Sequence, residues 1–174
     1  MNPMTFAVGP RAAQAGHRVI VHERLDSTNS EALRLARAGE RGPLWIVTRD
    51  QTAGRGRRGR EWISTPGNLA ASLLFTDTIT PAVAATLGFA ASLAVCQTCE
   101  ALAPNIAFAV KWPNDVLANG MKVAGILLES EMQGEVLAVV AGFGINLAEA
   151  PGGMSFPATS LGRLGAMVSA ETAF

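Results

Sequence analysis

The sequence predicts an α+β fold in which helices pack against a mixed β-sheet. Apolar runs of strand length alternate with segments of helical pattern, so neither kind of element dominates. Met132-Gln133-Gly134 separates two of these runs in the manner of a hairpin turn. At 174 residues, with 49% hydrophobic and 16% charged residues, the chain suits one globular domain with a real core.

The first half of the chain is expected to contain three strands and one helix. We expect residues 1–16 to be a flexible lead-in and residues 17–174 to form the domain. A helix is predicted to start at Asp26-Ser27-Thr28-Asn29, whose side chains can cap it, and to close at Gly39. Strands are predicted over residues 18–23, 44–48 and 69–75.

The second half is expected to begin with a long helix. Pro81 suits its first turn, it reaches about Leu102, and Pro104 stops it. Residues 148–168 are rich in Gly, Pro, Ser and Ala and are expected to be irregular. Residues 169–174 look like the opening of a helix, so we expect the chain to be cut there with a C-terminal segment missing. Strands are predicted over residues 106–110, 123–131 and 135–141, with a turn over 111–115.

Residues 51–62 (QTAGRGRRGREW) form the most informative stretch. Four of the 14 basic residues fall within six positions, with glycines between them and no acidic residue from Gln51 to Arg60. Glycine lets the backbone approach a ligand closely, and arginine presents a planar fork of donors to carboxylate or phosphate. The chain as a whole has no net charge, so its positive charge is concentrated locally in this loop. A local cluster of this kind favours a small anionic ligand over a polyanion.

Two other interpretations of this arginine loop are weaker. Gly54-x-Gly56-x-x-Gly59 matches the dinucleotide fingerprint, but residues 61–68 end in turn residues, whereas that fingerprint requires a helix directly after the glycines. A solvated or nonspecific RNA-binding loop is the remaining alternative, since charge runs are weak evidence.

The cysteines and the apolar segments indicate no further chemistry. Cys96 and Cys99 lie within the predicted long helix, not at a helix N-terminus, and are expected to be core residues. His17 and His22 are expected to be structural or exposed. No uninterrupted apolar run approaches the ~20 residues of a membrane span, and no membrane or DNA partner is expected.

Four more stretches carry unusual chemistry. Each has an ordinary structural interpretation alone, such as a turn, a strand-edge lysine or an N-cap. Together with the arginine loop, and in this order, they resemble the biotin–protein ligase (biotin–[acetyl-CoA-carboxylase] ligase) family from about Asp26 to Leu147. They are Asp26-Ser27-Thr28-Asn29, Lys111-Trp112-Pro113-Asn114-Asp115, Lys122-Val123-Ala124-Gly125-Ile126-Leu127-Leu128-Glu129 and Gly142-Phe143-Gly144-Ile145-Asn146.

The resemblance implies the biotin–lipoate ligase catalytic fold, which is similar to that of class II aminoacyl-tRNA synthetases. It implies a two-step reaction in which biotin and ATP give biotinyl-5′-AMP and pyrophosphate, and a carrier-domain lysine then takes the biotinyl group and releases AMP. Mg²⁺ is implied as a cofactor. The rivals are a lipoate- or octanoate-type ligase of the same fold, a biotin-sensing repressor, and the RNA-binding module.

Residue roles follow from the same resemblance. Lys122, Arg57, Arg55 and Asp115 are implied as catalytic, with Asp115 a tentative Mg²⁺ ligand. The nucleotide is expected to contact Arg57, Arg58, Arg60, Trp62 (stacked on adenine), Asn114, Asp115 and Asn146. Biotin is expected to contact Ser27, Thr28, Gln51, Gly54, Arg55, Arg57, Lys122, Gly125 and Gly142, the last two by leaving room for it.

The resemblance also implies partners and a compartment. The partner is the biotin carboxyl carrier domain of a biotin-dependent carboxylase, a homodimer is possible, and the compartment is cytoplasmic. Only about 25 residues precede Asp26, too few for the N-terminal DNA-binding domain of some relatives, and the small C-terminal β-barrel of the family is expected to be missing.

Overall fold

A seven-stranded mixed sheet organises the molecule. The structure is a computed structural model that describes residues 5–153 and 156–174. The strand order is β1-β2-β5-β9-β8-β7-β6, and only β1 and β2 run parallel. The strands are β1 (Arg18–Leu25), β2 (Leu44–Gln51), β5 (Leu69–Asp77), β6 (Phe108–Lys111), β7 (Asp115–Ala118), β8 (Met121–Gln133) and β9 (Val136–Ile145), with β3 (Gly54–Arg55) and β4 (Glu61–Trp62) forming a separate ribbon.

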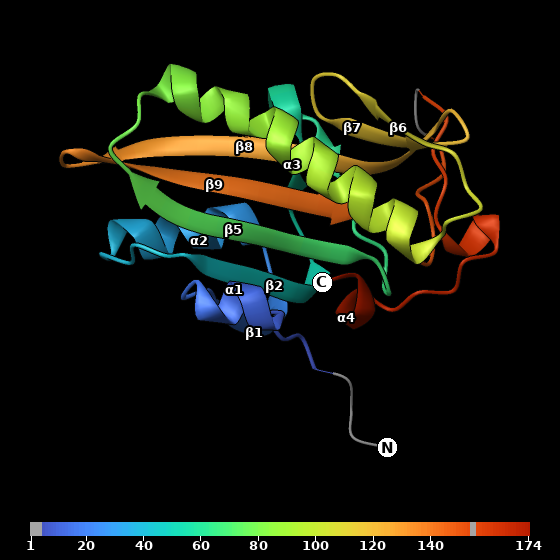
Figure 1. The fold of residues 1–174 in the computed structure, drawn as a ribbon, viewed down its shortest axis with the longest axis horizontal. Helices are drawn as coiled ribbons and strands as arrows, with labels where there is room; N and C mark the ends of the chain where they lie inside the picture. Colours follow the sequence, from blue (N-terminus) through green and yellow to red (C-terminus); the bar gives the residue numbers. More distant parts are fainter. Residues whose placement is uncertain (1–4, 154–155) are drawn as a thin grey trace.

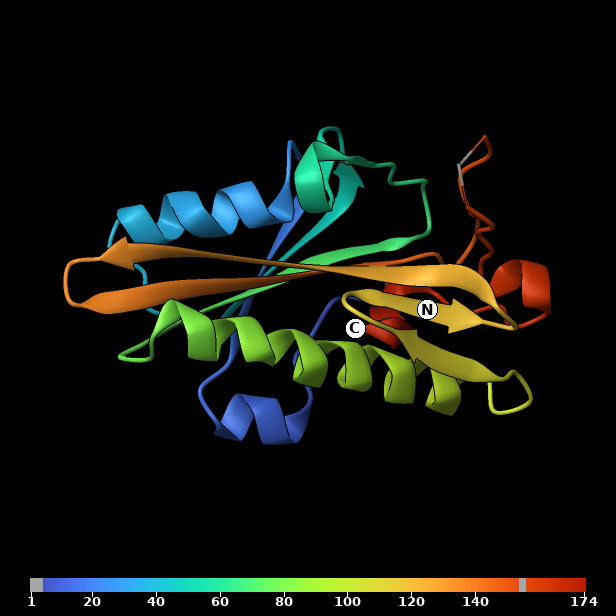
Figure 2. The same ribbon diagram turned by 90° about the horizontal axis from the view of Figure 1, so that it is seen from above.

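Helices cover both faces of this sheet (Figures 1 and 2). The blue helix α2 (Thr28–Arg37) and the teal arginine loop lie on one side, and the green helix α3 (Pro81–Leu102) crosses the other side (Figure 2). The predicted mixed sheet with packed helices is therefore confirmed. The short helical segments are α1 (Pro10–Gln14), η1 (Arg57–Gly59), η2 (Gly162–Leu164) and α4 (Ala170–Ala173).

The helix boundaries follow from capping residues, as predicted. The Ser27 hydroxyl accepts a hydrogen bond from the Ser30 amide at 3.4 Å and starts α2. The Thr80 hydroxyl does the same for the Val83 amide at 3.3 Å, with Pro81 in the first turn of α3. These bonds satisfy amide donors that have no partner within the helix. At the C-terminus the predicted helix opening is confirmed as α4, capped by Ser169.

Each face of the sheet has its own apolar core. Under α2, small helix residues such as Ala32 and Ala36 let Leu44, Ile46 and Leu74 pack closely against the helix. Under α3 and the ends of the chain lies a larger cluster with Val47, Val95, Cys99, Val116, Val123 and Leu161 at its centre. Full burial of each Leu, Ile or Val contributes roughly 1.5–3 kcal/mol, so both clusters stabilise the packing of the helices on the sheet.

The cysteines belong to this core, which confirms their prediction. Burial raises the pKa of the Cys99 thiol to about 12, and burial together with Glu100 raises that of Cys96. Both therefore stay protonated at neutral pH and lack the thiolate that redox or metal chemistry needs.

Helix α3 corrects one sequence argument. Its most apolar 18 residues have a mean hydropathy of 1.6, enough in length and composition to cross a membrane. Composition alone therefore does not exclude a spanning helix. In the fold α3 lies along the sheet, where Val95, Cys96 and Cys99 are buried in the core below it and Gly88 faces Leu128 of β8. Of those 18 residues 28% are buried, and the outer face of α3 leaves Phe89 and Leu93 more than half exposed.

The N-terminal segment and the second half of the sheet also differ from prediction. Residues 5–16, which were predicted to belong to a flexible lead-in, contain the helix α1. Phe6 among them is buried in an edge-to-face contact with Phe174. Residues 1–4 lie outside the described residues. Strand β7 was not predicted, since its four residues directly follow the 111–115 turn and are too short for a periodic signal.

Candidate active site

A pocket of about 780 Å³ collects almost every residue that the sequence singled out. It opens on the α2 side of the sheet, between the start of α2, the arginine loop, the 111–115 turn and the strands β8 and β9. Gly54 is the exception: a Cβ there would meet the Gln51 amide and the Trp62 carbonyl, so Gly54 lies behind the lining. The predicted residues that line the pocket are Ser27, Thr28, Gln51, Arg55, Arg57, Arg58, Arg60, Trp62, Asn114, Asp115, Lys122, Gly125, Gly142 and Asn146.

The glycines of β8 and β9 form the floor of the pocket. The antiparallel register pairs Gly125 with Gly144, and Gly142 pairs with Leu127. The indole of Trp62 lies directly on Gly144 and 2.9 Å from where a Cβ of Gly125 would be. Gly142 faces the Asn29 carboxamide. The space that these glycines leave is therefore taken by Trp62 and Asn29, which differs from the prediction that Gly125 and Gly142 leave it directly to a ligand.

A partly buried ion pair stands beside this floor. Lys122 Nζ lies 2.7 Å from Asp115 Oδ1, with side-chain exposures of 15% and 21%. The same ammonium lies 5.5 Å from the Trp62 ring centroid and 5.0 Å from that of Phe156. Backbone bonds from Lys122 to Pro157 and Thr159 hold the strand end that carries it. A cation that is largely shielded from water and has one carboxylate partner is suited to stabilise additional negative charge.

The arginine loop forms the outer wall. Arg57 Nη1 donates to Asn114 Oδ1 at 3.4 Å, and the Asn114 amide donates to the Ile126 carbonyl at 3.0 Å. Arg58 sits in the left-handed region at φ 58°, a conformation that costs a non-glycine residue about 1 kcal/mol. Within residues 5–153 and 156–174, the side chains of Arg58 and Arg60 have no hydrogen-bond or ion-pair partner. Their charge faces the solvent and the pocket.

The path of this loop confirms that it is not a dinucleotide fingerprint. The 3₁₀ turn η1 (Arg57–Gly59) ends on the third glycine, and after Arg60 the chain enters strand β4. No long helix N-terminus is therefore present at the loop to receive a pyrophosphate.

The start of α2 forms the opposite end of the pocket. Gln51 Oε1 accepts from the Thr28 amide at 3.0 Å and from its hydroxyl at 3.3 Å, and Gln51 Nε2 donates to Ser64 at 3.2 Å. The Ser72 hydroxyl donates to Asn29 Oδ1 at 2.6 Å and lies 2.7 Å from Thr28 Oγ1. Polar groups at this end are thus already bonded to one another.

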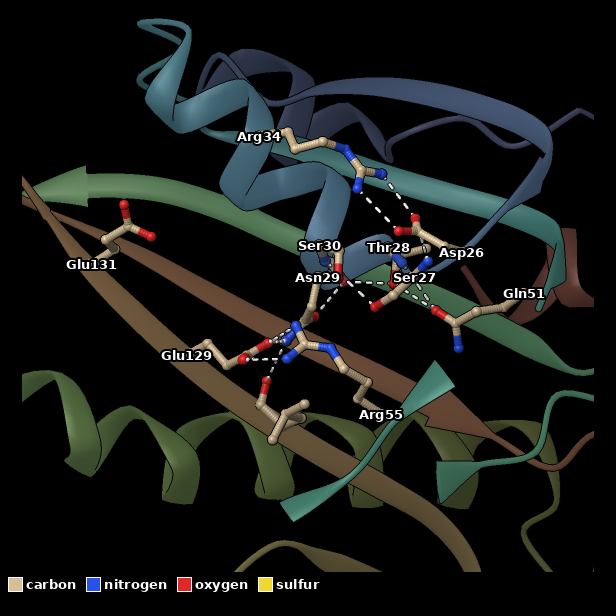
Figure 3. Close-up of polar contacts among 12 residues, drawn as sticks. Asp26, Ser27, Thr28, Asn29, Ser30, Arg34, Gln51, Arg55, Glu129 and Glu131 are labelled. Atoms are coloured by element: carbon tan, nitrogen blue, oxygen red, sulfur yellow. Dashed lines mark hydrogen bonds and ion pairs between the residues drawn. The ribbon is translucent and has the colours of Figure 1, made fainter. Parts of the chain in front are cut away.

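The sequence argument assigned no role to two residues here, Asn29 and Glu129. Asn29 Nδ2 donates to the Leu127 carbonyl at 3.2 Å and to Glu129 Oε2 at 2.9 Å. Glu129 in turn accepts two bonds from Arg55, at 2.9 and 2.7 Å (Figure 3). Both residues belong to singled-out motifs, but their contact spans about 100 positions. Only the sheet register reveals it.

Asn146 is the remaining predicted residue. Its amide donates to the Thr159 carbonyl at 3.1 Å, and its Oδ1 is buried with no hydrogen-bond partner among the described residues. Because Asn146 lines the pocket, this oxygen is available to a donor on a bound ligand.

Comparisons with known proteins identify the family. Residues 21–146 match the family model described as the biotin/lipoate A/B protein ligase family. The chain belongs to this family. A curated relative, the biotin–[acetyl-CoA-carboxylase] ligase of Paracoccus denitrificans, is 52% identical over 130 residues, which cover 74% of this chain and 54% of that protein. The bifunctional ligase/repressor BirA of Bacillus subtilis (strain 168) is 37% identical over 145 residues, or 82% and 44%.

Solved structures of this family share the fold. The biotin protein ligase of Leishmania major in complex with biotinyl-5-AMP has a TM-score of 0.74 at 27% identity, covering 89% of this chain and 69% of that one. The enzyme of Aquifex aeolicus in complex with biotin and ATP has a TM-score of 0.72 at 30% identity, covering 89% and 64%. The chain spans about half the length of the curated relatives it matches.

Proposed function

We propose that this chain carries out ATP-dependent biotinylation of a carrier-domain lysine through a biotinyl-5′-AMP intermediate. The observation that carries the proposal is the partly buried Lys122–Asp115 pair, which faces an arginine-rich loop across one pocket. Membership of a ligase family supports it, as do the biotin, ATP and biotinyl-5-AMP named for solved relatives.

In the first step a carboxylate oxygen of biotin attacks the α-phosphorus of ATP, and pyrophosphate leaves. Two anions must approach each other while charge builds on the phosphoryl oxygens, so positioning and cationic stabilisation lower the barrier. Lys122 would contact the carboxylate and the bridging phosphate oxygen. Arg57, Arg58 and Arg60 would surround the phosphates, and their lack of other strong partners leaves their charge available.

Biotin recognition belongs to the α2 end in this proposal. Ser27, Thr28 and Gln51 present hydroxyl and amide groups at the head of the pocket. A ureido ring offers two donors and one acceptor, which these groups can match. Without a ligand these groups bond to one another, so biotin would exchange those bonds for its own. An acid without such a ring could displace them but not replace them, and the pocket would discriminate against it.

Trp62 would form a wall for the adenine or for the mixed anhydride. Its indole already lies flat over the glycine floor beside Lys122, and an aromatic face can stack on a base. Asn146 Oδ1 and Asn114 would contact the nucleotide. Closing water out of this region protects a mixed anhydride from hydrolysis.

In the second step the neutral ε-amine of the carrier lysine attacks the carbonyl carbon of the anhydride. An amide bond forms, the bond from carbon to the phosphate oxygen breaks, and AMP leaves with the electron pair. The partner in this step would be a carboxylase carrier domain, consistent with the name of the Paracoccus relative. The cytoplasm is the compartment we propose, and homodimerisation stays a prediction.

Mg²⁺ fits this pocket only as a companion of the nucleotide. Asp115 already contacts Lys122, and the described residues contain no group of three acidic, His or Cys side chains that could hold a metal. Mg²⁺ commonly binds through substrate phosphates and one or two carboxylates. Asp115 would be that carboxylate, and the ion would neutralise phosphate charge.

The test of the full reaction is transfer to a carrier domain. The chain, biotin, MgATP and a purified biotin carrier domain are incubated, and the mass of the carrier is measured. One added biotinyl group is expected, and none on a carrier whose acceptor lysine is changed to arginine. A carrier that stays unmodified while the protein is folded would contradict the proposal.

A further inference from the structure

The contact between Glu129 and Arg55 joins the arginine loop to the sheet. Glu129 lies near the middle of β8, and its carboxylate accepts Arg55 Nη1 at 2.9 Å and Nη2 at 2.7 Å. Two parallel bonds fix the guanidinium in both distance and plane, which a single ion pair does not. With a side-chain exposure of 24%, Glu129 is partly shielded, so solvent screens this pair less than an exposed one.

The same carboxylate is held from the other side by α2. Asn29, 4% exposed, donates from Nδ2 to Glu129 Oε2 and to the Leu127 carbonyl, while its Oδ1 accepts from Ser72. Gly142 makes room for this carboxamide. Both donor and acceptor groups of Asn29 are therefore satisfied, and one orientation of its side chain is selected. The Glu129 carboxylate that it contacts is fixed as well.

We infer that Glu129 is a positioning residue: through Arg55 it holds the arginine loop over the pocket before any ligand binds. Asn29 fixes the Glu129 side chain and connects it to the start of α2, where Ser27 and Thr28 lie. The role of Arg55 is then to anchor the loop, because its guanidinium is already paired, whereas Arg57, Arg58 and Arg60 keep their charge for a ligand. A loop ordered in advance reduces the entropy that binding must remove.

The neighbouring Glu131 provides a matched control. It lies two residues along β8 on the same side of the strand, and it also accepts an arginine, Arg37 of α2, at 2.5 Å. Among the described residues, its hydrogen-bond and ion-pair partners are Arg37 and Gln133, and none belongs to the arginine loop. Changing Glu131 to alanine therefore removes an equivalent ion pair without releasing the loop.

The test uses the loop's own arginines as trypsin sites. In the ligand-free protein, cleavage after Arg57 and Arg58 is followed by mass spectrometry. For Glu129→Ala we expect cleavage about 3- to 10-fold faster than in the parent chain, the size expected for loss of one charge-assisted pair. Glu131→Ala should leave the rate at the parent value. Glu129→Gln keeps an acceptor oxygen and should lie between.

A double-mutant cycle tests the route through Arg55. If Glu129 acts through Arg55, Glu129→Ala adds nothing to cleavage after Arg58 in an Arg55→Ala background. Equal cleavage of the Glu129→Ala and Glu131→Ala variants, or a full additional effect in the Arg55→Ala background, would overturn the inference. Circular dichroism and the Tm of each variant separate loop release from general unfolding.

A kinetic measurement connects the positioning role of Glu129 to the reaction. It rests on the proposed function. In biotin-dependent pyrophosphate exchange, Glu129→Ala should raise the KM for biotin several-fold and change kcat less, because the loop must then be ordered during binding. A loop released only in Glu129→Ala, together with no exchange in the parent chain, would support the positioning role and contradict the proposed function.

Discussion

The two ends of the pocket are built on opposite principles. At the α2 end, the polar groups of Thr28, Asn29, Gln51 and Glu129 bond to one another and leave little unsatisfied. At the basic end, Arg58 and Arg60 have no partner among the described residues, and Asn146 Oδ1 is buried without one. The first end is complete without a ligand, whereas at the second end the cations that line the pocket outnumber the carboxylates, Glu61 and Asp115.

This difference matches the two tasks of an acyl-adenylating site. Recognition of a neutral ring needs groups fixed in advance, because only a rigid set of donors and acceptors rejects the wrong shape. Stabilisation of a phosphoryl transition state needs nearby cations, and at this end Arg58 and Arg60 contact no protein carboxylate within the described residues while Lys122 has one, Asp115. Changes at the α2 end should therefore alter stability and biotin binding, and changes at the basic end should alter ATP binding and reaction rate.

The largest effect is expected at Lys122. Lys122→Met removes the cation that we propose contacts the reacting atoms, so biotin-dependent pyrophosphate exchange should fall roughly 100- to 1,000-fold, as when one preorganised donor is lost from an active site. The measurement is the exchange rate at saturating biotin and ATP, with Lys122→Arg as the variant that keeps the charge. An exchange rate within a factor of two of the parent chain would remove the electrostatic role of Lys122.

Alanine substitutions at Gly142 and Gly144 compare the two ends of the pocket most directly. A methyl group at Gly142 would collide with the Asn29 carboxamide, so Gly142→Ala should lower the free energy of unfolding by about 1–3 kcal/mol. Urea denaturation measures this. At Gly144 the collision is with the indole of Trp62, which lies at the edge of a two-residue strand and can move.

Gly144→Ala should therefore cost less stability and should raise the KM for ATP. The comparison between the ends fails if the two variants lose equal stability, or if Gly142→Ala affects only the nucleotide.

The unpaired arginines predict a smaller, salt-dependent effect. Arg58→Gln breaks no contact within the described residues, so the Tm should not fall. The KM for ATP should rise about 3- to 10-fold at low salt, and the difference should shrink towards 1 M salt, where the screening length is about 3 Å. A rise in KM that is independent of salt would mean that Arg58 acts through loop shape and not through charge.

The smallest effect is expected from the exposed pair beside the α2 end. Hydrogen bonds from Arg34 lower the pKa of Asp26 to about 2, from an ordinary value of 3.8. The stabilisation is present above about pH 4 and is lost as the pH falls towards 2. Because Asp26 is half exposed, solvent screening limits it to at most about 1 kcal/mol.

Urea unfolding at pH 3 and pH 6 measures this contribution. The Asp26→Asn variant should lose less stability than the parent chain between these two pH values. An equal loss in both proteins would show that the Arg34 pair does not contribute to acid sensitivity.

Local signals predicted much of the fold. The long helix α3 was predicted with the correct ends because Pro81 and Pro104 bracket it, and the β8–β9 hairpin because a turn that contains Gly134 separates two apolar runs. Strand β7 and the burial of Phe6 were not predicted. Phe6 depends on a partner far along the chain, since it packs on Phe174. Strand β7 pairs with the neighbouring β8 across a register shift, and its four residues are too few for a periodic signal.

The pocket shows the same limit. Motif order brought Lys122, Asp115 and the arginine loop into one prediction, and the structure places them around one pocket. Motif order did not indicate that Arg55 forms an ion pair with Glu129, nor that Asn29 fills the space over Gly142. Those contacts arise from sheet register and from the docking of α2, neither of which leaves a periodic or compositional signal.

The most direct test of the account is pyrophosphate exchange with two acids. The chain is incubated with labelled pyrophosphate, MgATP and either biotin or lipoate, so that only formation of the acyl-adenylate is measured. The account predicts label in ATP with biotin and none above background with lipoate, because lipoate lacks the ureido groups that the α2 end matches. Exchange with lipoate, or no exchange with biotin by a folded protein that binds it, would contradict the assignment of the two ends.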